Sequence, residues 1–270
     1  MHWYDRQGRP CYQQRSKGGT YRDTNLRDAR QLNLCPSVNE ILRVINKEGL
    51  NIWREKQSAL SALTLPDQER HADDATRLAK IRQDAQKQVI EAAAEGTRIH
   101  DAIEKHFKRE RYDVRYEKHV TGAADALAEA FPEIRDWEAE CSFCHPRGFG
   151  GRVDLHSRSG RAVGDTKSRD FGPEKLARDL AFEQYVQLAA YAEGLDLCRT
   201  TRSAGPRHRV ELVTEPATLF SLFVSRSCPG LALVHRWEPA RCIQGLRTFY
   251  GALDVFCGQR DFDPWFGERA

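Results

Sequence analysis

The sequence changes character near residue 137, and this change limits the folds that the chain can adopt. Before it, residues 66–108 are rich in Ala, Glu, Gln, Lys and Arg and predict almost unbroken helix. After it, short runs separated by Gly or Ser turns predict three successive strands, at 137–145, 150–157 and 161–166. We therefore expect an α/β fold in which a mixed central sheet is flanked by helices.

The other segments add helices and strands to this pattern. Residues 1–35 predict an extended arm or short hairpin, and Ser37 with Glu40 forms a capping box that opens a helix through about residue 53. Gly96 is the weak point of the long helical stretch and predicts a kink, a break or a close approach to a neighbour. Further helices are predicted at 112–135, 173–194 and 239–256, and further strands at 210–214, 219–225 and 231–237.

Length and composition are those of a soluble globular protein. The 270 residues, 40% hydrophobic and 30% charged, are enough for one sizeable core with elaborations. No apolar run approaches the roughly 20 residues that span a bilayer, and the N-terminus lacks a secretion signal, so we expect a cytoplasmic protein without a membrane partner. A net charge of +3 neither predicts nor excludes a nucleic-acid partner.

Eight cysteines are present, and without a secretion signal we expect reduced thiols. Cys141 and Cys144, followed by His145, match the string that attaches haem, but haem attachment requires an oxidising compartment and a further axial ligand. The remaining cysteines form no second short pair of the kind that holds a metal cluster. Buried thiols on a strand are the preferred interpretation.

Asp154, Asp165 and Lys167 form the central candidate site. Ten residues separate the two aspartates, enough for a strand end, a tight turn and a returning strand that brings both carboxylates to one end of a sheet. Asp165 and Lys167 are two apart and point to one face of a strand, while the carbonyl of Thr166 offers another oxygen. Carboxylates beside a single lysine are what metal-assisted phosphodiester cleavage requires, although a surface hairpin with solvated charges remains the alternative.

Two helical faces carry further candidates. His100 and Glu104 are spaced i, i+4, and such a pair binds a metal directly or through water. Gln184, Gln187 and Tyr191 follow the spacing of one helical face. A solvent-facing polar stripe is the alternative for each set. Glu140 is a further candidate acid, and basic residues gather between 199 and 209.

These clusters, in this order, resemble the PD-(D/E)XK nuclease superfamily, most closely its RecB-like and phage-exonuclease branch. The resemblance covers roughly residues 36–260 and is most specific at 96–104, 150–167 and 187–191. Val153 stands where the superfamily has a nominal proline. The resemblance implies a restriction-endonuclease-like core with αβββαβ order. That core would span residues 86–260, after an N-terminal arm and helical extension (1–85) and before a C-terminal tail (261–270).

The activity implied by this resemblance is Mg²⁺-dependent hydrolysis of DNA phosphodiester bonds from DNA ends, with Mn²⁺ able to substitute. The residues implied to carry catalysis are Glu104, Asp154, Asp165 and Lys167. Those implied to hold the metal are Asp154, Asp165, Glu104, His100 and Thr166. Those implied to bind DNA or organise the site are Gln187, Tyr191, Gln184 and Arg152.

The implied partner is linear DNA with single- or double-stranded ends, in a bacterial or phage-infected host cell. A recombination partner protein is compatible with this activity, in recombination, repair or phage DNA processing. Two other classes stay open: a non-catalytic DNA-binding module, and a metal-dependent hydrolase of small phosphate compounds.

Overall fold

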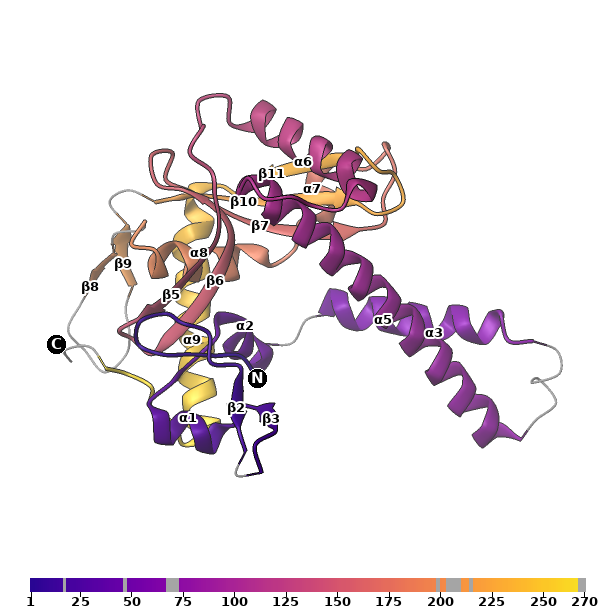
Figure 1. The fold of residues 1–270 in the computed structure, drawn as a ribbon, viewed down its shortest axis with the longest axis horizontal. Helices are drawn as coiled ribbons and strands as arrows, with labels where there is room; N and C mark the ends of the chain where they lie inside the picture. The colour runs from indigo at the N-terminus through magenta and orange to yellow at the C-terminus, as the bar shows by residue number, and fades with distance from the viewer. Residues whose placement is uncertain are drawn as a thin grey trace.

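A five-stranded mixed sheet forms the centre of the molecule (Figure 1). The computed structural model describes residues 1–16, 18–45, 48–66, 73–197, 200–202, 210–213 and 216–266. In spatial order the strands are β11 (Ala232–Arg236), β10 (Thr218–Ser225), β7 (Ala162–Arg169), β6 (Phe149–Ser157) and β5 (Glu138–His145). Strands β7 and β10 are parallel, and the other neighbours are antiparallel. The predicted mixed sheet and its three successive strands are confirmed.

Helices cover both faces of this sheet. On one face, α5 (Asp74–Phe107) and α6 (Glu117–Ala130) bury Ile99 and Leu127 against Phe220 of β10. On the other face, α8 (Gln184–Gly194) and α9 (Pro239–Arg260) bury Leu188 and Phe249 in a second cluster. The helices predicted at 112–135 and 239–256 are confirmed.

Two predicted helices have different bounds in the structure. Ser37 caps α2 (Val38–Ile41) as expected, its Oγ accepting from the N–H of Glu40 at 3.1 Å. That helix does not continue to residue 53, because the backbone passes through η1 (Leu42–Val44) and extends at Ile45 before α3 (Glu48–Leu63).

The helix predicted at 173–194 is also wrong at its start. Residues 173 and 174 precede the single turn of α7 (Ala177–Leu180), and α8 begins only at Gln184. Phe171 and Leu180 are both buried against Phe223 of β10. The segment therefore turns back onto the sheet before α8 begins.

The N-terminal arm is part of the same core. A short hairpin of β2 (Gln13–Arg15) and β3 (Tyr21–Asp23) matches the prediction. The rest of the arm packs inward, because β1 (Trp3–Tyr4) pairs with β4 (Cys35–Pro36) and buries Trp3 completely. Helix α1 (Leu26–Leu32) adds Ala29 to the cluster beneath α8 and α9.

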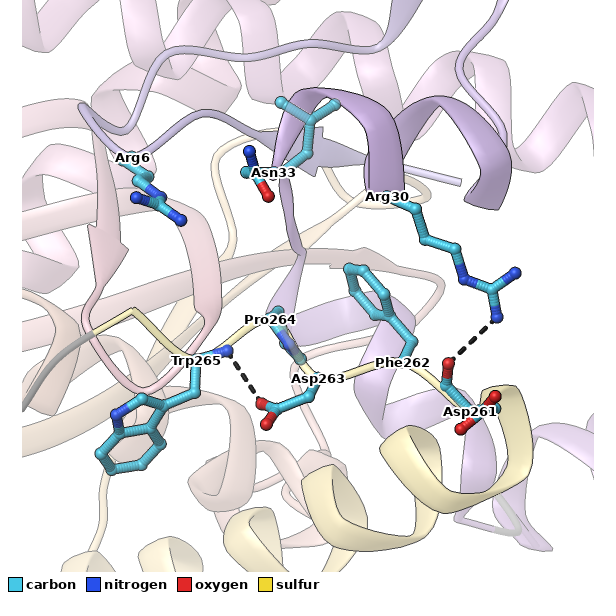
Figure 2. Close-up of a pocket in the computed structure, with 9 residues that line it drawn as sticks. Arg6, Arg30, Asn33, Asp261, Phe262, Asp263, Pro264 and Trp265 are labelled. Carbon is cyan, nitrogen blue, oxygen red and sulfur yellow. Dashed lines mark hydrogen bonds between the residues drawn. The ribbon is translucent and has the colours of Figure 1, made fainter. Parts of the chain in front are cut away.

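The segment after α9 folds back onto this arm and leaves a surface pocket of about 300 Å³ (Figure 2). Arg30 of α1 donates to the carbonyls of Arg260 and Asp261 at 2.7 and 3.0 Å. Phe262 packs into the core below. None of the candidate functional residues lines this pocket.

Helix α5 is continuous through the expected domain boundary at residue 85 and through Gly96. Residue 85, the expected end of the extension, lies inside this continuous 34-residue helix. Gly96 causes no break and instead allows close approach, since a Cβ there would lie 2.5 Å from Ser168 Oγ of β7. The N-terminal part of α5 and the antiparallel α3 project together from the body (Figure 1).

The strand predicted at 210–214 is present as β9 (Val210–Val213), which pairs with β8 (Thr200–Arg202) outside the central sheet. Most of the basic stretch at 199–209 lies outside the described residues.

The seven cysteines in the described part of the chain are free thiols, including Cys141 and Cys144. No helix among the described residues has both the length and the apolar character needed to cross a membrane.

Candidate active site

Asp154 and Asp165 meet where strands β6 and β7 diverge. The ladder between these strands ends at Leu155 opposite Gly164, and the next positions in the same register are Asp154 and Asp165. Beyond that point the Asp154 side chain replaces the backbone pairing. Its Oδ2 accepts a hydrogen bond from the backbone N–H of Thr166 at 2.8 Å. The spacing read from the sequence thus corresponds to two carboxylates at one end of a hairpin.

Asp165 is almost completely buried and is held from two sides. Its Oδ1 accepts a hydrogen bond from Gln187 Nε2 of α8 at 2.9 Å, and the same Nε2 lies 2.9 Å from the hydroxyl of Tyr191. Its Oδ2 contacts the ammonium group of Lys167. Lys167 and Gln187 therefore contact Asp165 directly, and Tyr191 contacts Gln187.

The surroundings of Asp154 oppose its ionisation. Burial, followed by the charge of Asp165, raises the pKa of Asp154 to about 7. Burial by itself would lower the pKa of Lys167, but the charges of Asp165 and Asp154 outweigh it and raise that pKa above its ordinary value. The pair of acids consequently shares one firmly protonated ammonium group, and the cluster carries excess negative charge once both acids are ionised.

Helix α5 brings His100 next to the acids. His100 Nδ1 lies 3.8 Å from Asp154 Oδ2, and its ring also interacts with the backbone of Thr166. Burial and then the charge of Lys167 lower the pKa of His100 to about 4. The imidazole is therefore neutral near pH 7 and has a nitrogen lone pair.

Glu104 lies one helical turn beyond His100 and has a partner that the sequence patterns did not suggest. Its Oε1 accepts from Lys108 Nζ at 2.5 Å. In the part of the chain that the structure describes, no three side chains from His, Cys, Asp and Glu are close enough to form a metal site. The structure thus assembles Asp154, Asp165, Lys167 and His100, while Glu104 stays at the edge of this group.

Glu140 and Arg152 form a second charged pair beside the acids. Glu140 lies on β5 between two paired positions, opposite Asp154, and has a left-handed backbone with φ 59°. Its carboxylate contacts the guanidinium of Arg152, the residue expected to bind DNA. The N-terminal arm borders this pair, because Tyr4 packs on Gly150 and its hydroxyl lies 2.7 Å from that of Tyr12.

Gln184 has a local structural contact rather than one with the acids. Its Oε1 accepts from the backbone N–H of Phe182 at 2.7 Å, in the bend before α8. Phe182 and the nearby Arg169 were not singled out from the sequence. Arg169 continues the alternation of Asp165 and Lys167 along β7, so the two-residue period of a strand carries the signal that would have found it.

Comparison with known proteins found no family model that matches this chain and no curated protein with significant sequence similarity.

Proposed function

We propose that this chain is a metal-dependent nuclease with a restriction-endonuclease-like core, which hydrolyses DNA phosphodiester bonds from DNA ends. The convergence of Asp154, Asp165 and Lys167 at the diverging strands carries the proposal. The order of α5, β5, β6, β7, α8 and β10 supports it, since this is the αβββαβ order that such a core requires, with α6, α7, β8 and β9 inserted between these elements. The resemblance of the sequence clusters to RecB-like and phage exonucleases supplies the choice of DNA ends.

The donor set suits Mg²⁺, with Mn²⁺ as a substitute. Both acids provide hard oxygen ligands. Burial, followed by the charge of Asp165, raises the pKa of Asp154, and a bound divalent cation would favour its charged form. Mg²⁺ usually keeps several waters and is bound by one or two carboxylates plus substrate phosphate, so a complete protein cage is not needed. Asp154 and Asp165 would hold the ion, with His100 and Glu104 reaching it directly or through water.

In this proposal the protein groups have separate tasks. The bound cation would supply Lewis acidity, which stabilises negative charge developing on the phosphate. Lys167 stays protonated because of the two neighbouring acids, so it orients the attacking water and phosphate oxygens by donating hydrogen bonds. Gln187 fixes the carboxylate of Asp165, and Tyr191 supports Gln187.

Cleavage assays with linear and covalently closed circular DNA test the proposal. We expect the unmodified protein with Mg²⁺ to degrade only linear DNA, and chelation to abolish the reaction. Asp165→Asn and Lys167→Ala should each lower the rate by about 100-fold or more, as expected for groups that hold the metal or stabilise the transition state. Asp101→Asn is the matched control, because Asp101 lies exposed on α5 and pairs with Lys105.

Three results would contradict this assignment. Full activity of Asp165→Asn would exclude the proposed metal site. DNA binding without cleavage by the unmodified protein would favour a binding module. Hydrolysis of bis(p-nitrophenyl) phosphate without DNA degradation would favour an enzyme of small phosphate compounds.

Metal binding can be measured independently of cleavage. A ligand that binds only the folded state at about 100 times its Kd stabilises a protein by about 2.7 kcal/mol. We therefore expect Mg²⁺ to raise the Tm of the unmodified protein near pH 8, with a much smaller rise for Asp165→Asn. An equal rise in both proteins would place the bound ion elsewhere.

A further inference from the structure

An exposed aromatic ring lies beside the candidate site without an evident structural need for exposure. Phe182, in the bend between α7 and α8, is 55% exposed. The guanidinium carbon of Arg169 lies 5.5 Å from the centre of its ring and 5.9 Å from that of the buried Phe223. Arg169 and Phe182 thus form a patch that is cationic and aromatic.

The guanidinium of Arg169 is available to an anion. No carboxylate of the described residues is within ion-pair distance of it. The adjacent Asp170 is already bound by Arg226, with Nε 3.2 Å from Oδ1. Burial lowers the pKa of Arg169, which indicates a partly desolvated cation. Such a group binds a phosphate more strongly than a fully hydrated one does.

The patch continues the row of proposed catalytic residues along β7. Asp165, Lys167 and Arg169 alternate along β7 and share one face of the sheet. Two residues of a strand span roughly 7 Å, a distance comparable with the spacing of consecutive phosphates in an extended polynucleotide strand. A strand with one phosphate at Lys167 can therefore place the next at Arg169.

The backbone at Phe182 is held in place in the bend before α8. The backbone N–H of Phe182 donates to Gln184 Oε1, and Leu180, two residues earlier, is buried against Phe223. A backbone that is already ordered reduces the conformational entropy lost on binding, which favours the use of this segment as a contact surface.

We propose that Arg169 and Phe182 form a subsite for single-stranded DNA, in which Arg169 binds the phosphate next to the scissile one and Phe182 stacks on an unpaired base. The inference rests on the proposed nuclease function and extends it to the substrate class. A base within a duplex has both faces stacked on its neighbours, so Phe182 favours a strand whose bases are free.

Binding assays in EDTA test this subsite without cleavage. The probes are a fluorescent oligothymidylate of about 20 nucleotides and a duplex of the same length. We expect Phe182→Ala to weaken binding of the single strand by about ten-fold and to leave duplex binding unchanged, in line with the effect of removing one stacking aromatic. Phe182→Trp should retain the affinity, and its indole fluorescence should fall when the strand binds.

Arg169→Gln should weaken single-strand binding and lower its salt dependence by the equivalent of one phosphate contact, a change of about 0.7 in the logarithmic slope. Tyr21→Ala is the matched control, because Tyr21 is an exposed aromatic on β3 with no contact to the site. It should bind both probes like the unmodified protein.

Unchanged single-strand binding by Phe182→Ala would overturn the subsite, and so would equal losses for single strand and duplex. A changed Tm with unchanged binding would show that the ring only shields Arg169. The two proposals fail separately. Loss of stacking-dependent binding leaves a metal-dependent nuclease intact, whereas absence of cleavage leaves the EDTA binding result standing.

Discussion

Asp154 occupies a position that opposes its own ionisation. Burial and the charge of Asp165 raise its pKa to about 7, although the N–H of Thr166 and the ammonium of Lys167 favour the charged form. A carboxyl group whose pKa is higher in the folded state than in the unfolded state stabilises the fold while it is protonated. That stabilisation is complete below about pH 4 and is lost as the pH rises through about 7.

Asp154→Asn should therefore stabilise the metal-free protein near pH 8 and have little effect near pH 4. The amide keeps an oxygen for the N–H of Thr166 but removes the charge, so we expect a gain of about 1–3 kcal/mol in the free energy of unfolding. Urea denaturation at the two pH values measures it. The same variant should lose cleavage activity, and a loss of stability near pH 8 would contradict the electrostatic argument.

Asp136 provides a control, because its pKa is shifted in the direction opposite to that of Asp154. Hydrogen bonds from Ser157 and Ser159 lower the pKa of Asp136 to about 2. Its contribution to stability is present above about pH 4 and is lost as the pH falls towards 2. Asp136→Asn should accordingly lower the Tm near pH 7, where Asp154→Asn raises it, and a matching rise in both variants would point to a general charge effect.

Among individual residues, spacing together with the family resemblance led to the central site. The separation of Asp154 from Asp165, and the two-residue step to Lys167, predict contacts that the structure contains. Lys108 and the left-handed backbone of Glu140 were not predictable in this way. Both depend on how α5 and β5 approach the site, which is decided by contacts between elements distant in sequence.

Two glycines illustrate how closely the helices approach the sheet. At Gly122 of α6, an added Cβ would lie 2.2 Å from the carbonyl oxygen of Gly230, a backbone atom in the turn between β10 and β11. At Gly96 of α5, it would meet the Oγ of Ser168, which a side-chain rotation can remove. The two positions differ in what must move.

Gly122→Ala should therefore destabilise the protein, and Gly96→Ala should not. Overpacking costs typically about 1–3 kcal/mol, while replacing Gly by Ala inside a helix contributes up to about 1 kcal/mol. We expect a net loss of about 1–2 kcal/mol for Gly122→Ala and a value within about 1 kcal/mol of zero for Gly96→Ala. Chemical denaturation of the two variants compares them directly, and equal effects would show that the loop containing Gly230 yields.

Periodicity predicted the regular elements better than their ends. The strands at 137–166 and the helix from Pro239 follow from turn residues and a proline in the first helical turn. The start of α8 and the end of α2 were not predicted from the sequence. Before α8, Phe171 and Leu180 are buried against the sheet. After α2, the backbone becomes extended at Ile45. Tertiary packing determined these boundaries.

The whole molecule combines a well-packed body with a thin projecting hairpin. Of the α3 side chains that the structure describes, only Ser61 is buried, whereas Ile52, Leu60 and Leu63 are exposed. Helices α8 and α9, by contrast, lie in the main core. The inward packing of the N-terminal arm had no clear signature in its polar sequence, so its place in this body was not predictable.

Hydrogen exchange should separate the two parts. Amides of α3 have few buried neighbours and are expected to exchange through local opening, well before those of α8, α9 and β6. Exchange followed by mass spectrometry of peptides measures the difference. Protection of α3 equal to that of α9 would indicate that the hairpin is covered in solution, and dilution would then show whether a second copy covers it.

Helix α5 connects the projecting hairpin to the candidate site. Leu78, exposed on the projecting part, and His100, beside Asp154, are 22 residues apart on a helix without proline, a separation of roughly 33 Å. Because α5 is one continuous helix, a partner that binds the hairpin tip and displaces it sideways would also move the imidazole of His100 relative to Asp154, without contacting the sheet.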